Sequence, residues 1–138
     1  MIPFDDRGLL LGDGLFETLL ALDGDLPHLA AHLARMAAGC DVLNLPFDRE
    51  HAERVVREVT PGEGRFAVRL TLTAGSGGRG LDRPAAPVPA LFAKAAPSVP
   101  VTAPATAIIA ATRRNEGSPA SRLKTLAYLD NVLARAEA

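Results

Sequence analysis

The sequence contains one cysteine, no tryptophan and only two lysines among its 138 residues. The single thiol excludes a disulfide within the chain, and its place in a helical pattern predicts that Cys40 is buried and inert. No signal peptide is recognisable, and no apolar run reaches the roughly 18 residues that span a membrane. We therefore expect a cytoplasmic protein without a membrane segment.

Charge is nearly balanced, with 15 basic and 16 acidic side chains and a net charge of −1. A nucleic-acid-binding surface usually leaves a basic excess, so this balance argues against a nucleic-acid partner. Apolar residues make up 48% of the chain, which predicts a packed core rather than disorder.

Hydrophobic periodicity predicts an α+β sandwich. Strands are expected at 9–11, 15–22, 65–74, 90–96 and 106–114. Helices are expected at 27–43, at 49–59 with Asp48 as N-cap, and from about Ser121 onward.

The same patterns divide the chain into domains. A Gly/Ser/Pro-rich linker, 115–120, separates an N-terminal α+β domain, 1–114, from the start of a second domain, 121–138. The last residues have the pattern of a helix without a cap or a stop signal. We therefore expect the second domain to be truncated.

Lys124 is unusual because the other 13 basic side chains, apart from Lys94, are arginines. Unlike arginine, lysine can lose its proton at accessible cost and attack a carbonyl carbon. On a helix from Ser121, Lys124 shares a polar stripe with Tyr128, Asn131 and Arg135. Lys124 is then either an exposed lysine of the first turn or a partly buried amine poised for Schiff-base chemistry.

The segment GSGGRG, 75–80, matches the dinucleotide-binding pattern G-x-G-x-x-G in letters only. That motif needs a helix to begin at once, and the proline-rich LDRPAAPVP follows instead. The kinase glycine-rich loop is excluded too, because its downstream lysine context is missing. The loop is then either a flexible connection or a mobile segment that presents Arg79 to an anionic ligand.

Two further patterns carry no predicted chemistry. His28 and His32 are spaced i, i+4 like a metal pair, but no third ligand is evident, so we expect no metal site. Asp13, in the sequence GDG, is expected to be a turn residue.

Three segments in this order and at this spacing resemble the fold-type IV pyridoxal-phosphate enzymes, the class IV aminotransferase family. They are LGDGLFETLLALDGDLPHLAAHLARM, TAGSGGRG and LKTLAYLDNVLARAEA. The resemblance implies pyridoxal 5′-phosphate as cofactor, with Lys124 as its covalent attachment point and catalytic base. It also implies that Arg35 binds the cofactor phosphate and that Tyr128 contacts the phenolic oxygen of the cofactor.

The resemblance also assigns the substrate side of the site. Phe16, Glu17 and Thr18 match the F-E-T segment that borders the site, with Phe16 and Thr18 as substrate contacts. GSGGRG looks most like 4-amino-4-deoxychorismate lyase, in which the loop arginine, here Arg79, meets a substrate carboxylate. The family further implies a homodimer that acts on a small amino substrate.

The chain departs from the family at Ala127, where members often carry asparagine, and at Leu20, where aminotransferases tend to have arginine. Leu20 argues against the branched-chain enzymes, and the glycine-rich loop favours a lyase that releases pyruvate and p-aminobenzoate for folate synthesis. A branched-chain or D-amino-acid aminotransferase is the alternative, and a truncated, cofactor-free domain is a third. The family's second domain supplies the acid that pairs with the pyridine nitrogen, and these residues lack it.

Overall fold

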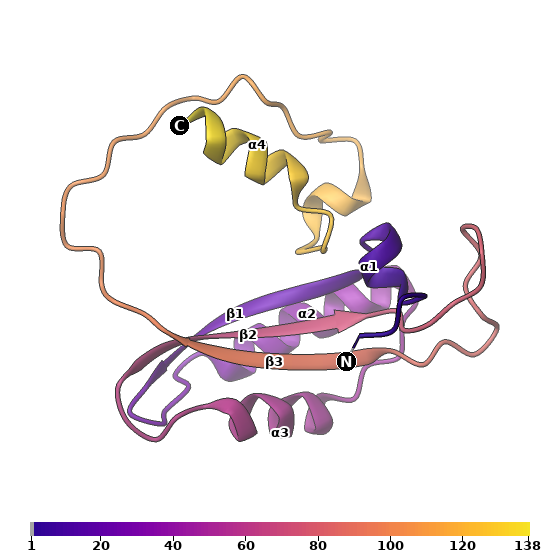
Figure 1. The fold of residues 1–138 in the computed structure, drawn as a ribbon, viewed down its shortest axis with the longest axis horizontal. Coiled ribbons are helices and arrows are strands. Elements are labelled where there is room, and N and C mark those ends of the chain that lie inside the picture. The colour runs from indigo at the N-terminus through magenta and orange to yellow at the C-terminus, as the bar shows by residue number, and fades with distance from the viewer. Residues whose placement is uncertain (1) are drawn as a thin grey trace.

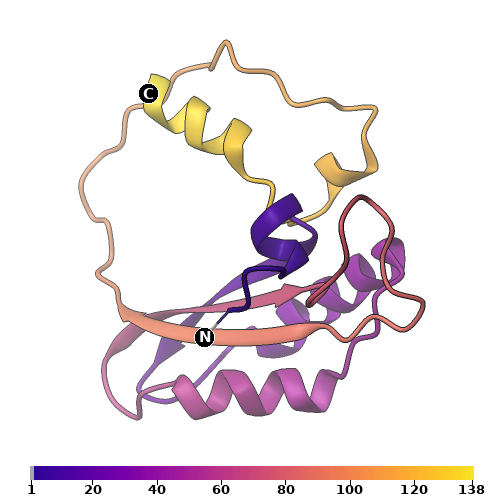
Figure 2. The same ribbon diagram turned by 45° about the vertical axis from the view of Figure 1, so that its right-hand side comes forward.

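The computed structural model describes residues 2–138 and confirms the α+β class. A three-stranded antiparallel sheet has the order β1-β2-β3. Its strands are β1 (Gly14–Leu22), β2 (Arg65–Thr73) and β3 (Ala90–Pro97). The two longest helices, α2 (Leu29–Leu43) and α3 (Arg49–Val59), pack side by side against one face of this sheet (Figures 1 and 2).

Strand alternation explains why that face is covered. Leu15 and Leu19 of β1 and Val68 and Leu70 of β2 point to the helices, and each is at most 2% exposed. Leu33 of α2 meets them in the same core cluster. Each such side chain contributes about 1.5–3 kcal/mol by leaving water, so this core holds the helices to the sheet.

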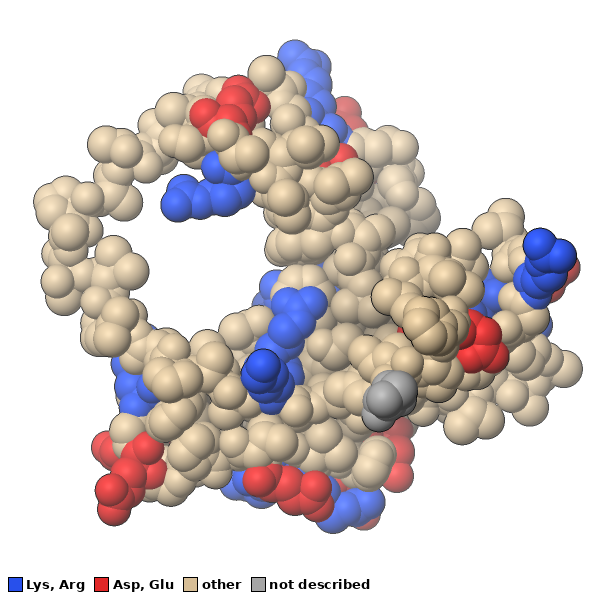
Figure 3. Space-filling view, viewed as in Figure 1, with Lys and Arg blue, Asp and Glu red and all other residues tan. Residues whose placement is uncertain are grey.

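The opposite face of the sheet carries one row of polar and charged side chains. Thr18 of β1, Arg69 of β2 and Lys94 of β3 are neighbours in register, and all three are exposed. Residues 98–118 leave β3 as an arc beyond this face and return beside α1 (Arg7–Leu11), and α4 (Leu129–Glu137) lies within the arc (Figure 1). Figure 3 shows basic side chains standing where the sheet borders the opening of the arc.

Several predicted elements are confirmed and one changes type. Both central helices and the two strands at 65–74 and 90–96 form close to their predicted bounds, and Asp48 caps α3 through His51 N at 2.9 Å. The strand predicted at 9–11 is wrong, because α1 forms there. The Asp6 carboxylate accepts from Leu9 N at its start, and Gly12 ends it with φ +66°.

The prediction for the C-terminal part is also partly wrong. No strand forms at 106–114, because that segment runs exposed along the arc without a neighbouring strand. A short 3₁₀ turn, η1 (Pro119–Arg122), stands where the last helix was expected to begin, and α4 starts only at Leu129. Lys124 is therefore not helical and shares no helical stripe with Tyr128.

None of the helices within residues 2–138 is long and apolar enough to cross a membrane. Cys40 is buried, as predicted, and burial raises the pKa of its thiol to about 11.

Candidate active site

The segment that carries Lys124 is held by the start of β1. Phe16 N donates to Lys124 O at 2.9 Å, and Leu126 N donates to Gly14 O at 3.0 Å. Gly14 permits this approach, since a Cβ there would lie 2.2 Å from Leu72 O and 2.8 Å from Leu126 Cδ1. The sheet thus fixes the backbone of Lys124 without any helix.

The Lys124 side chain lies over an aromatic pair. Its Nζ is 4.1 Å from the centroid of the Phe16 ring and 5.6 Å from that of Tyr128. The two rings meet edge to face, with centroids 5.0 Å apart and an interplanar angle of 83°. Arg69 Cζ also lies 3.7 Å from the Phe16 centroid. Two cations therefore share one ring, and each is attracted to its π face.

A cavity of about 190 Å³ joins this region to α2. Both Lys124 and Arg35 line it. The apolar side chains Leu15, Phe16, Met36, Val42 and Leu123 form much of the remaining wall. The structure thus brings the two residues expected to hold the ends of the cofactor to one cavity, while their roles stay predictions.

Arg35 is oriented by Glu17, which is only 1% exposed. Arg35 Nε and Nη2 donate to the two carboxylate oxygens at 2.6 and 2.5 Å, and His32 Nδ1 donates to Oε2 at 2.8 Å. Burial alone would raise the pKa of Glu17, but the hydrogen bonds from Arg35 and His32 lower it. The same bond raises the pKa of Arg35. Among the described residues Nη1 of Arg35 has no partner, so this nitrogen can take an anion.

Phe16, a predicted substrate contact, also lines this cavity, whereas Tyr128, Thr18 and Arg79 lie apart from it. Tyr128 borders it only through its contact with Phe16. Thr18 faces the open side of the sheet beside Arg69, and Arg79 is exposed in the loop after β2. Neither Thr18 nor Arg79 is among the residues that line the cavity, so their substrate contacts stay predictions.

Sequence reasoning missed two groups. Arg69 sits on the ring beside Lys124, and burial lowers its pKa. The alternation of β2 contains the signal, because Arg69 falls between the inward residues Val68 and Leu70. Asp13 is more than a turn residue, since it accepts hydrogen bonds from Arg7 and Arg83. No local pattern could reveal the pairing with Arg83, which lies 70 residues further along the chain.

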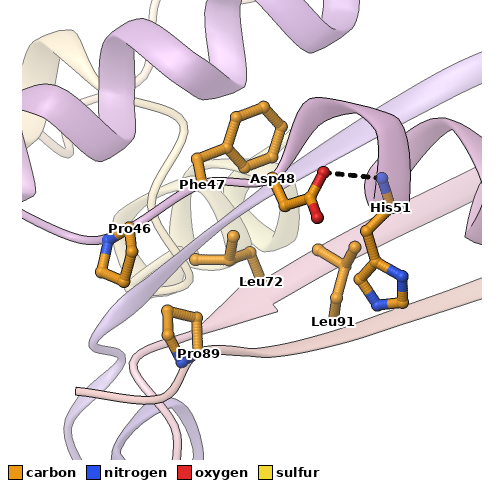
Figure 4. Close-up of a pocket in the computed structure, with 7 residues that line it drawn as sticks. All are labelled: Pro46, Phe47, Asp48, His51, Leu72, Pro89 and Leu91. Carbon is orange, nitrogen blue, oxygen red and sulfur yellow. Dashed lines mark hydrogen bonds between the residues drawn. The ribbon is translucent and has the colours of Figure 1, made fainter. Parts of the chain in front are cut away.

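A second cavity, of about 300 Å³, lies on the helix side of the sheet (Figure 4). Its wall is mostly apolar, with Asp48 and His51 at the start of α3. The Asp48 carboxylate is already used to cap that helix, as the dashed line in Figure 4 shows. The cavity is larger than the one at Lys124, and neither an amine nor a guanidinium lines it.

The metal prediction concerns His28 and His32. Within residues 2–138 no group of three or more His, Cys, Asp or Glu side chains is placed to hold a metal ion. His32 instead donates to Glu17 and takes part in orienting Arg35.

Comparisons with known proteins identify the family of this chain. The family model "Amino-transferase class IV" matches residues 14–138. A protein of Methanocaldococcus jannaschii, provisionally assigned as a branched-chain-amino-acid aminotransferase, is 35% identical over 96% of this chain and 49% of its own length. The crystal structure of 4-amino-4-deoxychorismate lyase from Pseudomonas aeruginosa superposes with a TM-score of 0.85. It is 33% identical and covers 100% of this chain and 53% of that one.

A pyridoxal-phosphate-bound structure, described as a hypothetical aminotransferase from Mycobacterium tuberculosis, has a TM-score of 0.59. It is 28% identical over 70% of this chain and 34% of its own. The chain spans about half the length of the first relatives that it matches. From the family match over residues 14–138 and the identity to these relatives, the chain belongs to the class IV aminotransferase family, the pyridoxal-phosphate-dependent enzymes of fold type IV.

Proposed function

We propose that the protein is a pyridoxal-phosphate-dependent lyase that cleaves 4-amino-4-deoxychorismate into pyruvate and p-aminobenzoate. The described residues fit the cofactor, because a primary amine and a guanidinium line one cavity with aromatic and aliphatic walls. Lys124 suits the aldehyde, and the unpartnered Nη1 of Arg35 suits the phosphate. Tyr128 is proposed to contact the phenolic oxygen.

When bound, pyridoxal phosphate supplies an electron sink for the substrate carbon that loses a proton. Lys124 accepts that proton on Nζ as a neutral amine and returns it at a neighbouring atom. Phe16 and Tyr128 orient the amine, since its Nζ lies 4.1 and 5.6 Å from the centroids of their rings. Arg35, held by Glu17, fixes the cofactor phosphate so that the reacting end meets Lys124.

The observation that carries the lyase assignment is the glycine-rich segment 75–80 with Arg79, together with the similarity to the Pseudomonas lyase. In this proposal Arg79 meets a substrate carboxylate, and Phe16 and Thr18 border the substrate. Production of p-aminobenzoate would place the protein in folate synthesis. A homodimer and a cytoplasmic location also belong to the proposal, and both rest on the family resemblance.

The second candidate is a branched-chain or D-amino-acid aminotransferase. The similarity to the Methanocaldococcus protein over 96% of the chain supports it. Arg69 supports it equally, because a second exposed guanidinium beside Lys124 could bind the carboxylate of an amino acid. Leu20, where aminotransferases tend to carry arginine, argues against a branched-chain enzyme.

The first experiment tests the cofactor site that both candidates share. The full-length protein is mixed with pyridoxal phosphate, the absorbance of the bound cofactor is followed, and the adduct is trapped with borohydride and located by mass spectrometry. We expect the adduct on Lys124, unchanged in Lys94→Ala and lost in Lys124→Ala. An adduct that persists in Lys124→Ala refutes the site, and no bound cofactor indicates the cofactor-free domain.

Substrates are then offered separately. Release of pyruvate from 4-amino-4-deoxychorismate, without transfer between an amino acid and 2-oxoglutarate, selects the lyase. Transfer without pyruvate release selects the aminotransferase and rejects the main proposal.

A further inference from the structure

The glycine-rich loop, here residues 75–83, is tied down at both ends. At its start, Arg7 N donates to Gly75 O at 2.9 Å and Gly77 N donates to Asp5 O at 3.1 Å. Asp5 also accepts from Ser76 Oγ at 3.0 Å. The loop therefore leaves β2 along the N-terminal segment before it projects from the body of the protein (Figures 1 and 2).

The far end of the loop is held by the side chain of Arg7, which is only 4% exposed. Its Nη1 donates to Asp82 O at 3.0 Å, and its Nη2 donates to Leu81 O at 2.9 Å. Gly77 packs directly on this side chain, since a Cβ there would lie 2.7 Å from Arg7 Cδ. The guanidinium of Arg7 thus acts as a clamp that holds the end of the loop, and the aliphatic part of the same side chain packs against its beginning at Gly77.

Asp13 holds the clamp in place. Its Oδ2 accepts from Arg7 Nε at 2.9 Å and from Arg83 Nε at 2.9 Å, and Arg83 Nη1 donates to Leu43 O. The hydrogen bond from Arg83 lowers the pKa of Asp13, burial opposes this, and Arg7 adds to the lowering. The Asp13 carboxylate therefore stays charged and binds both Arg7 and Arg83.

Between these ties, Gly78 and Arg79 make no hydrogen bond among the described residues, and both are exposed. Arg79 thus lies in the middle of a loop whose two ends are fixed by hydrogen bonds. Asp13 also adjoins Gly14, whose carbonyl binds the Lys124 segment through Leu126 N. The residue that holds the loop, Asp13, is therefore next in sequence to Gly14, which binds the segment that carries Lys124.

We propose that Asp13 is a positioning residue, which holds Arg7 and Arg83 and so fixes the loop that carries Arg79 relative to the strand end that carries Lys124. This inference rests on the proposed function, in which Arg79 meets a carboxylate of the substrate. Fixing the loop favours substrate binding through entropy, because a preorganised loop loses less conformational freedom when the substrate binds. How firmly the loop is fixed can be measured without any catalytic turnover.

The first readout is limited trypsin digestion of the folded full-length protein, with cleavage after Arg79 followed by mass spectrometry. Asp13→Asn and Arg83→Lys should accelerate this cleavage on the order of ten-fold, because each weakens a charge-assisted hydrogen bond. Asp41→Asn, at an exposed carboxylate on α2, should leave the rate unchanged. Equal cleavage rates in all four proteins overturn the inference.

Two glycine variants test the same clamp without touching the carboxylate. Gly77→Ala pushes against Arg7, whereas Gly78→Ala meets nothing within 4 Å. We expect Gly77→Ala to be cleaved as fast as Asp13→Asn and Gly78→Ala to be cleaved like the wild type. The reverse order contradicts the clamp even if Asp13→Asn does not fold.

The second readout is steady-state kinetics with the cofactor bound. Asp13→Asn should raise KM on the order of ten-fold, with a smaller change in kcat and an unchanged cofactor absorbance. In an Arg79→Gln background the same substitution should add little, because both act on one contact. Additive effects overturn the positioning role. A wild type without turnover refutes the proposed function and the substrate half of this inference, whereas the digestion still decides whether Asp13 holds the loop.

Discussion

Replacing Glu17 by glutamine removes a buried negative charge that receives two hydrogen bonds from Arg35 and one from His32. Hydrogen bonds to charged groups contribute about 1.5–3 kcal/mol each. Arg35 is 59% exposed and can turn to water, so its share must be reduced for solvent screening. We expect Glu17→Gln to lower the free energy of unfolding by about 2 kcal/mol at pH 7.

The lowered pKa of Glu17 also predicts how this loss of stability depends on pH. The pKa of Glu17 in the folded protein lies below its ordinary value of 4.5, because the bonds from Arg35 and His32 outweigh burial. The stabilisation is therefore complete above pH 4.5 and is lost as the pH falls through the folded pKa. The stability difference between wild type and Glu17→Gln should stay constant from neutral pH down to this range and then shrink.

Urea denaturation followed by circular dichroism at several pH values measures this difference. The control is Glu53→Gln, which breaks an exposed i, i+4 pair with Arg57 and should cost about 0.3–0.5 kcal/mol. If Glu17→Gln loses no more than the control, or if its deficit persists unchanged at acid pH, the assignment of Glu17 as the charged anchor of Arg35 is refuted.

Two further predictions concern packing. Gly14→Ala should lower the free energy of unfolding by about 3 kcal/mol or more, because its Cβ would meet Leu72 O at 2.2 Å, whereas Gly62→Ala meets nothing within 4 Å and should be close to neutral by thermal melting. Wild-type-like melting of Gly14→Ala would contradict the close approach of Leu72 O and Leu126 Cδ1 to this position. The Cys40 thiol, with its pKa raised to about 11, should react with a thiol reagent at pH 8 only after unfolding. Rapid reaction of the folded protein would show that Cys40 is not buried.

The local elements could be predicted because their signals lie within single segments. The alternation of residues 65–74 and the helical spacing of residues 27–43 each place apolar side chains on one face, and burial of that face rewards the predicted structure. The family resemblance likewise rests on contiguous segments, and the match to residues 14–138 confirms it. The sequence by itself therefore determined the fold class, the main helices and strands, and the family.

The surroundings of the site residues depended on contacts between distant segments. Lys124 is not helical, because the backbone of residues 124–126 pairs with β1, and these hydrogen bonds outweigh the local helical pattern. Asp13 binds Arg7 and Arg83, which only the folded chain brings together. Such pairings carry no periodic signal, since their energy arises from burial and charge between segments. For this reason only the tertiary structure decided how Lys124, Arg35 and the Arg79 loop are held.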